Sequence, residues 1–301
     1  MCQPIFTDYA FKPHLMKSKN LFYLLLLLVF GACSSQKAKK PASEDLIVAT
    51  YNIRYNTPND GENAWPNRKE QVKGLIRYHE FDLFGTQEGL IGQLNDLAEM
   101  QEFAFTGVGR DNGEQAGEHS AIFYKKSRFE LLDSGDFWLS ETPDEPSYGW
   151  EAKHRRICSW AKFNDRQTGK TFFVFNAHFD HQAVEARRQS GMLVVEKMKE
   201  VAGDAPILFL GDLNSTPDTE QIITIKSFLN DAYEVSEIQP YGPVGTFNSF
   251  DFLAPMDRRI DYIFVSDHFT VKKYGVLTDS YDQKYPSDHQ PVVAKVVIDG
   301  Q

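Results

Sequence analysis

Cysteine is scarce in this chain, and its scarcity limits how the fold can be stabilised. Of the three cysteines, Cys2 and Cys33 lie near the N-terminus, which leaves Cys158 in the remaining sequence. A lone cysteine cannot form an internal disulfide, so stability must come from a hydrophobic core. No group of cysteines and histidines has the spacing of a structural zinc site, which argues against a zinc-stabilised fold.

Positive charge is also in short supply. The chain has 32 lysines and arginines against 42 aspartates and glutamates, for a formal net charge of -10. Affinity for long nucleic acid comes mainly from phosphate neutralisation by Lys and Arg, so the balance argues against a protein that grips nucleic acid along its surface. A small or locally bound phosphoester remains compatible. Acidic residues gathered at a metal site would contribute to the same balance.

The chain has no long apolar run, but a short one lies near its start. Lys17 and Lys19 precede an apolar segment over residues 21–30, and Gly31 and Ala32 then lead into Cys33. About ten apolar residues are too few to span a bilayer, so the pattern predicts a secretory signal. The small pair before the cysteine resembles the lipobox of bacterial lipoproteins, in which Cys33 would be acylated. An ordinary signal peptide cut nearby is the alternative.

The same segment divides the chain into parts. We expect residues 1–15 to be a mis-assigned start, residues 16–32 a lipoprotein signal peptide and residues 33–44 a lysine-rich tether. Residues 45–301 lack an internal linker or repeat and are long enough for one large domain. The protein is then expected to be an exported lipoprotein, membrane-anchored through a lipid and facing the periplasm or the cell surface. No protein partner is evident.

Apolar and β-branched runs predict a fold rich in strands. Interleaved helices and hairpin-like runs of strands indicate two mixed sheets packed face to face, with helices outside. Helical spacing of apolar residues predicts helices over 67–79, 91–100 and 183–201. The expected strands cover residues 46–51, 81–84, 103–107, 120–125, 129–138, 157–164, 171–176, 206–210, 260–265, 269–276 and 291–298.

Polar side chains stand at the ends of six of these strands. Gly211 to Asn214 alone would be compatible with a tight turn. If the strands lie in packed sheets, however, the six ends can converge on one edge, where carboxylates repel each other unless a cation lies among them. Their oxygen atoms suit Mg²⁺ or Mn²⁺. The residues are Asn52, Glu88, Asn176, His178, Asp212, Asn214, Asp261, Asp288 and His289.

The order of these motifs along the chain resembles the endonuclease/exonuclease/phosphatase superfamily. Each motif is short, but the ordered series is specific and covers nearly all of residues 45–301. The resemblance implies a four-layer αββα sandwich with its site at one end of the two sheets. The motifs are Tyr51-Asn52-Ile53-Arg54, Gln87-Glu88, Asn176-Ala177-His178, Gly211-Asp212-Leu213-Asn214, Arg259-Ile260-Asp261-Tyr262 and Ser287-Asp288-His289.

The resemblance also implies which residues bind the metal and which act on the attacking water. Glu88 matches the position of the family's principal metal ligand, with Asn52 beside it, and Asp288 would help to hold the metal or its waters. Asp212 would orient or deprotonate the attacking water. Asn214 would bind the same water or a phosphoryl oxygen.

Two histidines complete the implied machinery. Asp261 is placed to accept a hydrogen bond from His289 and so fix its tautomer. His289 and His178 would donate to phosphoryl oxygens as negative charge builds there. Asn176 and Arg156 are the expected substrate contacts, since the guanidinium fork matches phosphate oxygens. A solvated turn over residues 153–156 is the alternative for Arg156.

The substrate stays open at this point. The segments 65–68, 155–160 and 178–181 resemble the bacterial branch near the deadenylase-like nucleases. The acidic balance and the leader favour a metal-dependent phosphatase or phosphodiesterase on a small ester over a nuclease acting on short or single-stranded nucleic acid. Trp138, Trp150 and Trp160 are candidates to stack a base or sugar, although we expect most of them in the core. A third alternative, an inactive binding lipoprotein, conflicts with the intact Glu88, Asp212 and His289.

Overall fold

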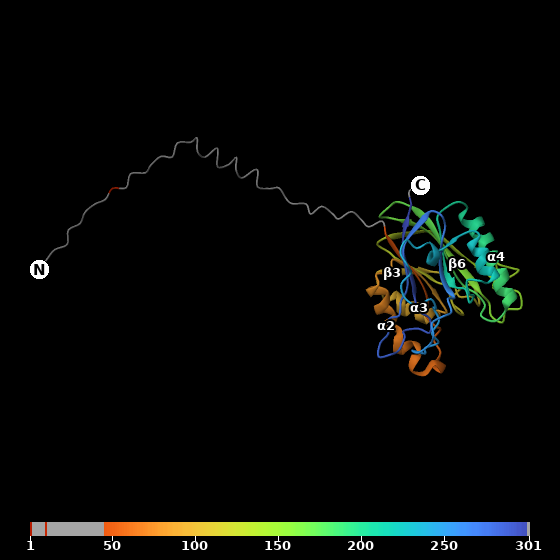
Figure 1. The fold of residues 1–301 in the computed structure, drawn as a ribbon. Coiled ribbons are helices and arrows are strands. Elements are labelled where there is room, and N and C mark those ends of the chain that lie inside the picture. Colours follow the sequence, from red (N-terminus) through yellow and green to blue (C-terminus); the bar gives the residue numbers. More distant parts are fainter. Residues whose placement is uncertain (2–9, 11–44, 300–301) are drawn as a thin grey trace, which may run out of the picture. The chain divides into compact units, whose positions relative to one another are not determined.

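Two six-stranded sheets carry the fold of the computed structural model, which describes residues 1, 10 and 45–299 (Figure 1). The first sheet has the order β11 (Phe269–Val276), β12 (Val292–Ile298), β1 (Leu46–Asn52), β2 (Leu83–Gln87), β4 (Ile122–Lys125) and β3 (Phe103–Thr106). The second has the order β5 (Phe129–Trp138), β6 (Ile157–Asp165), β7 (Thr171–His178), β8 (Ile207–Asp212), β10 (Asp261–Val265) and β9 (Asn230–Asp231).

Helices cover the outer faces of both sheets. Figure 1 shows α2 (Trp65–Tyr78) and α3 (Ile91–Ala98) on one side of the molecule and α4 (Val184–Ala202) on the other. The remaining helices are short: the 3-10 helix η1 (Pro58–Asn63), α5 (Glu220–Lys226) and α6 (Ala232–Val235). The predicted four-layer αββα sandwich is therefore confirmed.

Three apolar clusters fill the spaces between the layers. One lies between the sheets and joins strand residues such as Val48, Phe163 and Leu210. A second packs α4 and α5 against the second sheet, and a third packs α2 and α3 against the first. Burial of these large side chains provides the main driving force for folding. Cys158 is buried in the second cluster as a free thiol, so the described part of the chain is stabilised without disulfides.

The strand registers bring the polar ends of the strands together. β1 and β2 run parallel and pair Asn52 with Gln87, while β7 and β8 run parallel and pair His178 with Asp212. β10 is antiparallel to β8 and places Asp261 opposite Asp212. The ends of four strands and the start of a fifth therefore meet at one edge of the sandwich.

The stretch between Asn214 and Arg259 holds the largest difference from the sequence-based expectation. α5, β9 and α6 lie there, in a region for which no elements were predicted. These elements have seven, two and four residues, which is too short for a hydrophobic period to be visible. The predicted leader, the predicted lipidation site Cys33 and the predicted tether lie outside the described residues. Within the described residues, none of the helices is long and apolar enough to cross a membrane.

Candidate active site

A polar cavity of about 660 Å³ opens at the edge where the strand ends meet. Seven of the predicted site residues line it: Glu88, Arg156, His178, Asp212, Asn214, Asp288 and His289. Asn52 and Asp261 lie directly behind this surface and contact Asp212 or His289. The other lining residues are Arg54, Tyr55, Asp60, Arg110, Glu118, His154, His181, Phe247, Ser249 and Phe250.

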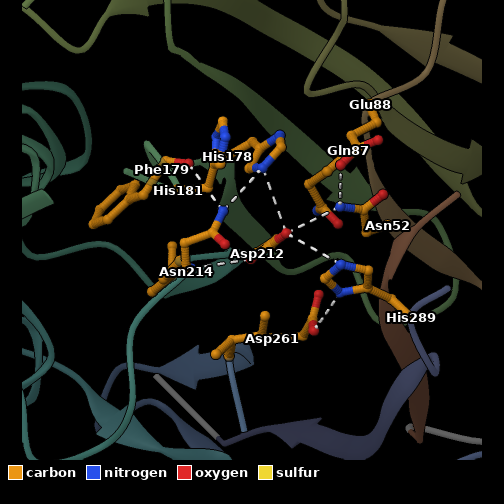
Figure 2. A network of polar contacts seen from close by, with 12 residues as sticks. Asn52, Gln87, Glu88, His178, Phe179, His181, Asp212, Asn214, Asp261 and His289 are labelled. Atoms are coloured by element: carbon orange, nitrogen blue, oxygen red, sulfur yellow. Dashed lines mark hydrogen bonds and ion pairs between the residues drawn. The ribbon is translucent and has the colours of Figure 1, made fainter. Parts of the chain in front are cut away.

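Asp212 occupies the centre of the polar network in Figure 2. Its Oδ2 accepts a hydrogen bond of 2.9 Å from Asn52 Nδ2, and its Oδ1 accepts one of 3.0 Å from the Asn214 backbone N–H. Two imidazoles flank the carboxylate, with His178 Nε2 at 3.4 Å and His289 Nε2 at 3.7 Å from Oδ2. Burial, followed by the charge of Asp261, raises the pKa of Asp212 above its ordinary value. A buried carboxylate with a raised pKa is suited to accept a proton from water.

The Nδ1 atom of His289 forms a hydrogen bond with the carboxylate of Asp261, which can only accept hydrogen bonds when it is ionised. Its Nδ1 lies 2.9 Å from Asp261 Oδ2, which also accepts a 2.6 Å hydrogen bond from Thr246 Oγ1. This contact fixes the ring with Nε2 toward Asp212. Burial alone would lower the pKa of His289, but Asp261 and Asp212 outweigh it and hold the pKa well above its usual value. His289 is therefore held as an imidazolium.

His178 has neighbours of the opposite character. Arg156 Nη1 lies 3.1 Å from its Nδ1, and Asn214 Nδ2 lies 3.1 Å from its Nε2. Burial, assisted by the charge of Arg156, lowers the pKa of His178 to about 3. His178 is therefore a neutral imidazole, in contrast to His289.

Glu88, Asp288 and Arg54 form the other side of the cavity. Glu88 Oε1 accepts from Asn52 Nδ2 at 3.1 Å, and its Oε2 accepts from the Tyr55 backbone N–H at 3.1 Å. Burial, followed by repulsion from Glu88, raises the pKa of Asp288 to about 6 despite the nearby charge of His289. Arg54 lies 3.9 Å from both carboxylates. Arg54 also pairs with Asp60, and the charge of Arg68 acts on Asp288, so this side holds three carboxylates beside two guanidinium groups.

Five residues that line the cavity hold backbone conformations that favour glycine, among them Ser249 and Phe250 with φ angles of 56° and 59°. Arg54, Glu88 and Asn214 have φ angles of 54°, 63° and 46°, and each follows the end of a strand. Such conformations cost about 1–3 kcal/mol each and are typical of functional sites. They turn the chain sharply, so that the side chains point into the cavity.

The donor set fits a hard divalent cation on the Glu88 side. Glu88 and Asp288 offer carboxylate oxygens, the ligands that Mg²⁺ and Mn²⁺ prefer, and Asp288 is destabilised as an anion without a balancing charge. Asn52 presents its amide N–H to the carboxylates of Glu88 and Asp212, while its Oδ1 accepts from the Arg54 backbone N–H. In this orientation its amide group holds Glu88 and Asp212 in place.

A second group of potential ligands surrounds Asp212. Oxygen and nitrogen atoms of Asp212, Asp261 and His289 lie within 4.8 Å of one another. The His289–Asp261 hydrogen bond already occupies two of these groups, so a cation there would compete with it. Glu88 and Asp288 are therefore the better candidates.

Asn176 does not reach the cavity, which corrects its predicted role as a substrate contact. It is fully buried between the sheets, where its Nδ2 donates at 2.9 Å to the carbonyl oxygens of Thr86 and Ala121. Its Oδ1 accepts from Gln87 Nε2 at 2.6 Å. Side chains alternate between the two faces of a strand, so His178 and Asn176 lie on the same face of β7. Asn176 is two residues farther from the end of the strand and therefore lies deeper in the sandwich.

Several cavity residues were missing from the sequence-based prediction. Arg110 binds Glu118 through two hydrogen bonds of 2.6 and 2.8 Å, and the His154 and His181 rings stack with centroids 5.9 Å apart. Arg54 forms a two-bonded ion pair with Asp60. Arg54 belongs to a recognised motif and His181 to the segment 178–181, so both could have been included. Arg110, Glu118 and His154 lie in loops with no periodic signal. Trp138, Trp150 and Trp160 are not among the residues that line the cavity.

Comparison with known proteins agrees with this geometry. The family model described as "Endonuclease/Exonuclease/phosphatase family" matches residues 49–289. The solved structure of a Bacteroides thetaiotaomicron mannosyl-6-phosphatase is 43% identical, with a TM-score of 0.81, and the match covers 84% of this chain and 99% of that chain.

More distant relatives share the fold. An uncharacterized protein of Acanthamoeba polyphaga mimivirus is 27% identical over 76% of this chain and 91% of its own length. The human nocturnin catalytic domain is 20% identical with a TM-score of 0.66, over 84% of this chain and 93% of that chain, which shows a common fold. The ordered motifs, the sandwich and the family match over most of the sequence agree, and the chain belongs to the endonuclease/exonuclease/phosphatase family.

Proposed function

We propose that this protein is a divalent-metal-dependent phosphatase that hydrolyses a sugar phosphate monoester. The observation that carries the chemistry is the buried Asp212 carboxylate between a cationic and a neutral imidazole, beside the Glu88–Asp288 pair. The similarity to a mannosyl-6-phosphatase over 99% of that chain supports the substrate class.

Each group around Asp212 has a separate task in this mechanism. Asp212 accepts the proton of the attacking water, and Asn214, whose backbone holds the carboxylate, helps to orient that water. His289, kept protonated by Asp261, donates from Nε2 to a phosphoryl oxygen as charge builds on it. His178 donates as a neutral group. A Mg²⁺ or Mn²⁺ bound by Glu88 and Asp288 would neutralise charge on the phosphoryl oxygens. As water attacks, the bond from phosphorus to the sugar oxygen breaks, and that oxygen takes up a proton from solvent and leaves as a hydroxyl.

The remainder of the cavity suits a hydroxylated leaving group. Arg110, Glu118, His154 and His181 supply charged and polar groups that can hydrogen-bond to hydroxyls. Tyr55, Phe247 and Phe250 add aromatic surface to the same cavity. The net charge of -10 disfavours long nucleic acid as the substrate.

A substrate panel tests the proposal. The purified protein should release inorganic phosphate from mannose 6-phosphate with Mg²⁺ or Mn²⁺, and EDTA should abolish the release. The panel should also contain inositol phosphates, sphingomyelin, and single-stranded RNA and DNA. Cleavage of RNA or DNA without activity on sugar phosphates would favour the nuclease alternative. Activity that persists in EDTA would contradict the metal-dependent mechanism, and no activity on any substrate would support a binding protein.

A further inference from the structure

Arg156 contacts the end of β7 and the loop that follows it. The side chain is only 4% exposed, and its two terminal nitrogens face His178, the last residue of β7, and His181 in the loop. Nη1 lies 3.1 Å from His178 Nδ1, and Nη2 lies 2.9 Å from His181 Nδ1. Its Nε lies 3.5 Å from Asp180 Oδ2, and Asp180 Oδ1 accepts from two backbone N–H groups at the start of α4. The guanidinium therefore forms hydrogen bonds to the protein through both terminal nitrogens, and its Nε lies within ion-pair distance of Asp180.

These contacts restrict the protons on both rings. A guanidinium donates hydrogen bonds and cannot accept one, so each Nδ1 that faces Arg156 must present a lone pair. A neutral imidazole with an unprotonated Nδ1 carries its hydrogen on Nε2. His178 and His181 are then both Nε2–H tautomers.

The surroundings of His178 offer little support for the other tautomer. A hydrogen on Nδ1 would need an acceptor, and Glu118 Oε2 lies 3.7 Å away. That oxygen is already bound by Arg110 Nη1 at 2.6 Å. On the opposite edge of the ring, Nε2 lies 3.4 Å from Asp212 Oδ2, the nearby acceptor, and 3.1 Å from Asn214 Nδ2, whose amide also donates to Phe179 O at 3.1 Å.

We infer that Arg156 is a positioning residue that fixes His178 as the Nε2–H tautomer and keeps this donor directed at Asp212 and the reacting phosphoryl group. The inference rests on the proposed function for its catalytic consequence, but not for the tautomer itself. It differs from the sequence-based expectation that Arg156 binds substrate. Although Arg156 lines the cavity, each of its two terminal nitrogens already donates one hydrogen bond to an imidazole, to His178 and to His181.

The tautomer can be measured without any substrate. Long-range ¹H–¹⁵N correlation spectra of histidine-labelled protein distinguish a protonated ring nitrogen from an unprotonated one. The chain has eight histidines, and the signals that disappear in His178→Gln identify this ring. We expect His178 to carry its hydrogen on Nε2 in the wild-type protein and to change to the Nδ1–H form, or to a mixture, in Arg156→Met. A wild-type Nδ1–H form would overturn the inference.

Kinetics separate positioning from direct substrate binding. With mannose 6-phosphate as substrate, Arg156→Met should lower kcat by about 10–10²-fold, because a misdirected donor costs at most what a lost one does, while KM changes little. Arg156→Lys, which keeps one charged donor, should recover part of the rate. A variant that raises KM and leaves kcat intact would show that Arg156 contacts the substrate and would contradict the inference.

A double variant makes the test sharper. If Arg156 acts through His178, Arg156→Met should add almost nothing to the loss already caused by His178→Gln. A further tenfold loss in the double variant would contradict the inference. Arg155→Met is the matched control, because the neighbouring Arg155 stacks on Tyr148 and is not among the residues that line the cavity. It should leave the rate and the His178 spectrum unchanged. If Arg156→Met does not fold, the wild-type spectrum and Arg156→Lys still decide the matter.

Discussion

His289 and His178 flank the same carboxylate, but neighbours of opposite chemistry hold them. Asp261 accepts from His289, while Arg156 donates to His178. Both rings are buried and present Nε2 to Asp212, at 3.7 and 3.4 Å. The partner on the far nitrogen therefore decides which ring is an imidazolium and which is neutral.

The two pairs also differ in where their members come from. His178 and Arg156 both belong to the second sheet, at the end of β7 and just before β6. His289 precedes β12 of the first sheet, whereas Asp261 begins β10 of the second. The neutral donor is thus assembled within one sheet, and the charged donor depends on contact between the sheets. We expect changes to the cationic pair to have the larger effects.

Removal of the Asp212 carboxylate or the His289 imidazole should have the largest effect on activity. Asp212→Ala or His289→Ala should lower kcat by about 10²–10⁴-fold while the fold stays intact, because each removes a proton-transfer group or a charged donor. Phosphate release and circular dichroism measure the two properties. His268→Ala is the control, since His268 lies beside Ser266 and is not among the cavity residues. Near-normal activity of either folded variant would eliminate the assigned role.

Asp261→Asn tests the cationic pair more selectively. The amide keeps the shape of the side chain but removes the charge that holds the pKa of His289 high. We expect kcat at neutral pH to fall by about 10–10²-fold, comparable to or more than Arg156→Met. The pH above which activity is lost should also move down. An unchanged pH profile would show that His289 does not act as an imidazolium.

The smallest effect should be on the Tm of the metal-free protein. The contributions of His178 and His289 to Tm should depend on pH in opposite directions. The pKa of His178 falls from 6.5 to about 3 on folding, so the unfolded chain binds the extra proton between these values. His178→Gln should therefore lose less Tm than the wild type as pH falls from 6.5 toward 3.

His289 should behave in the opposite way in the same experiment. Its pKa is raised on folding, so its stabilising contribution is fully present below 6.5 and is lost as pH rises toward the folded value. The Tm deficit of His289→Gln should therefore shrink as the pH increases. Parallel pH dependences of the two variants would contradict the contrast between the rings.

The sequence was enough to predict those parts of the site that lie at strand ends. The cluster around Asp212 follows from motifs next to long apolar strands, where position along the chain determines position in the sheet. The Asp261–His289 contact was implied by the resemblance of these motifs to the family. Arg110 and Glu118 could not be found this way. They lie in a glycine-containing loop over residues 107–117 and its flank, and such loops are placed by tertiary contacts without a periodic signal.

Asn176 shows a different limit of prediction. Its motif correctly marked the end of β7, but two residues separate a side chain that reaches the cavity from one that does not. The sequence gives no sign that Asn176 would be used against the facing sheet. Only the distance between the sheets, which depends on how the whole core packs, reveals this.

The hydrogen bonds of Asn176 to the facing sheet also have a consequence for how activity arises during folding. Opposite Asn176 lies Gly85, where a Cβ atom would come within 2.6 Å of the Asn176 side chain, so the two sheets interlock at this point. Glu88 follows β2 on one half of the interlock, and His178 and Asp212 stand on the other. Neither sheet alone carries all of the proposed catalytic and metal-binding side chains. Competence for hydrolysis should therefore emerge in a single step, with the closure of the sandwich, and a partly folded chain should be inert toward phosphoesters.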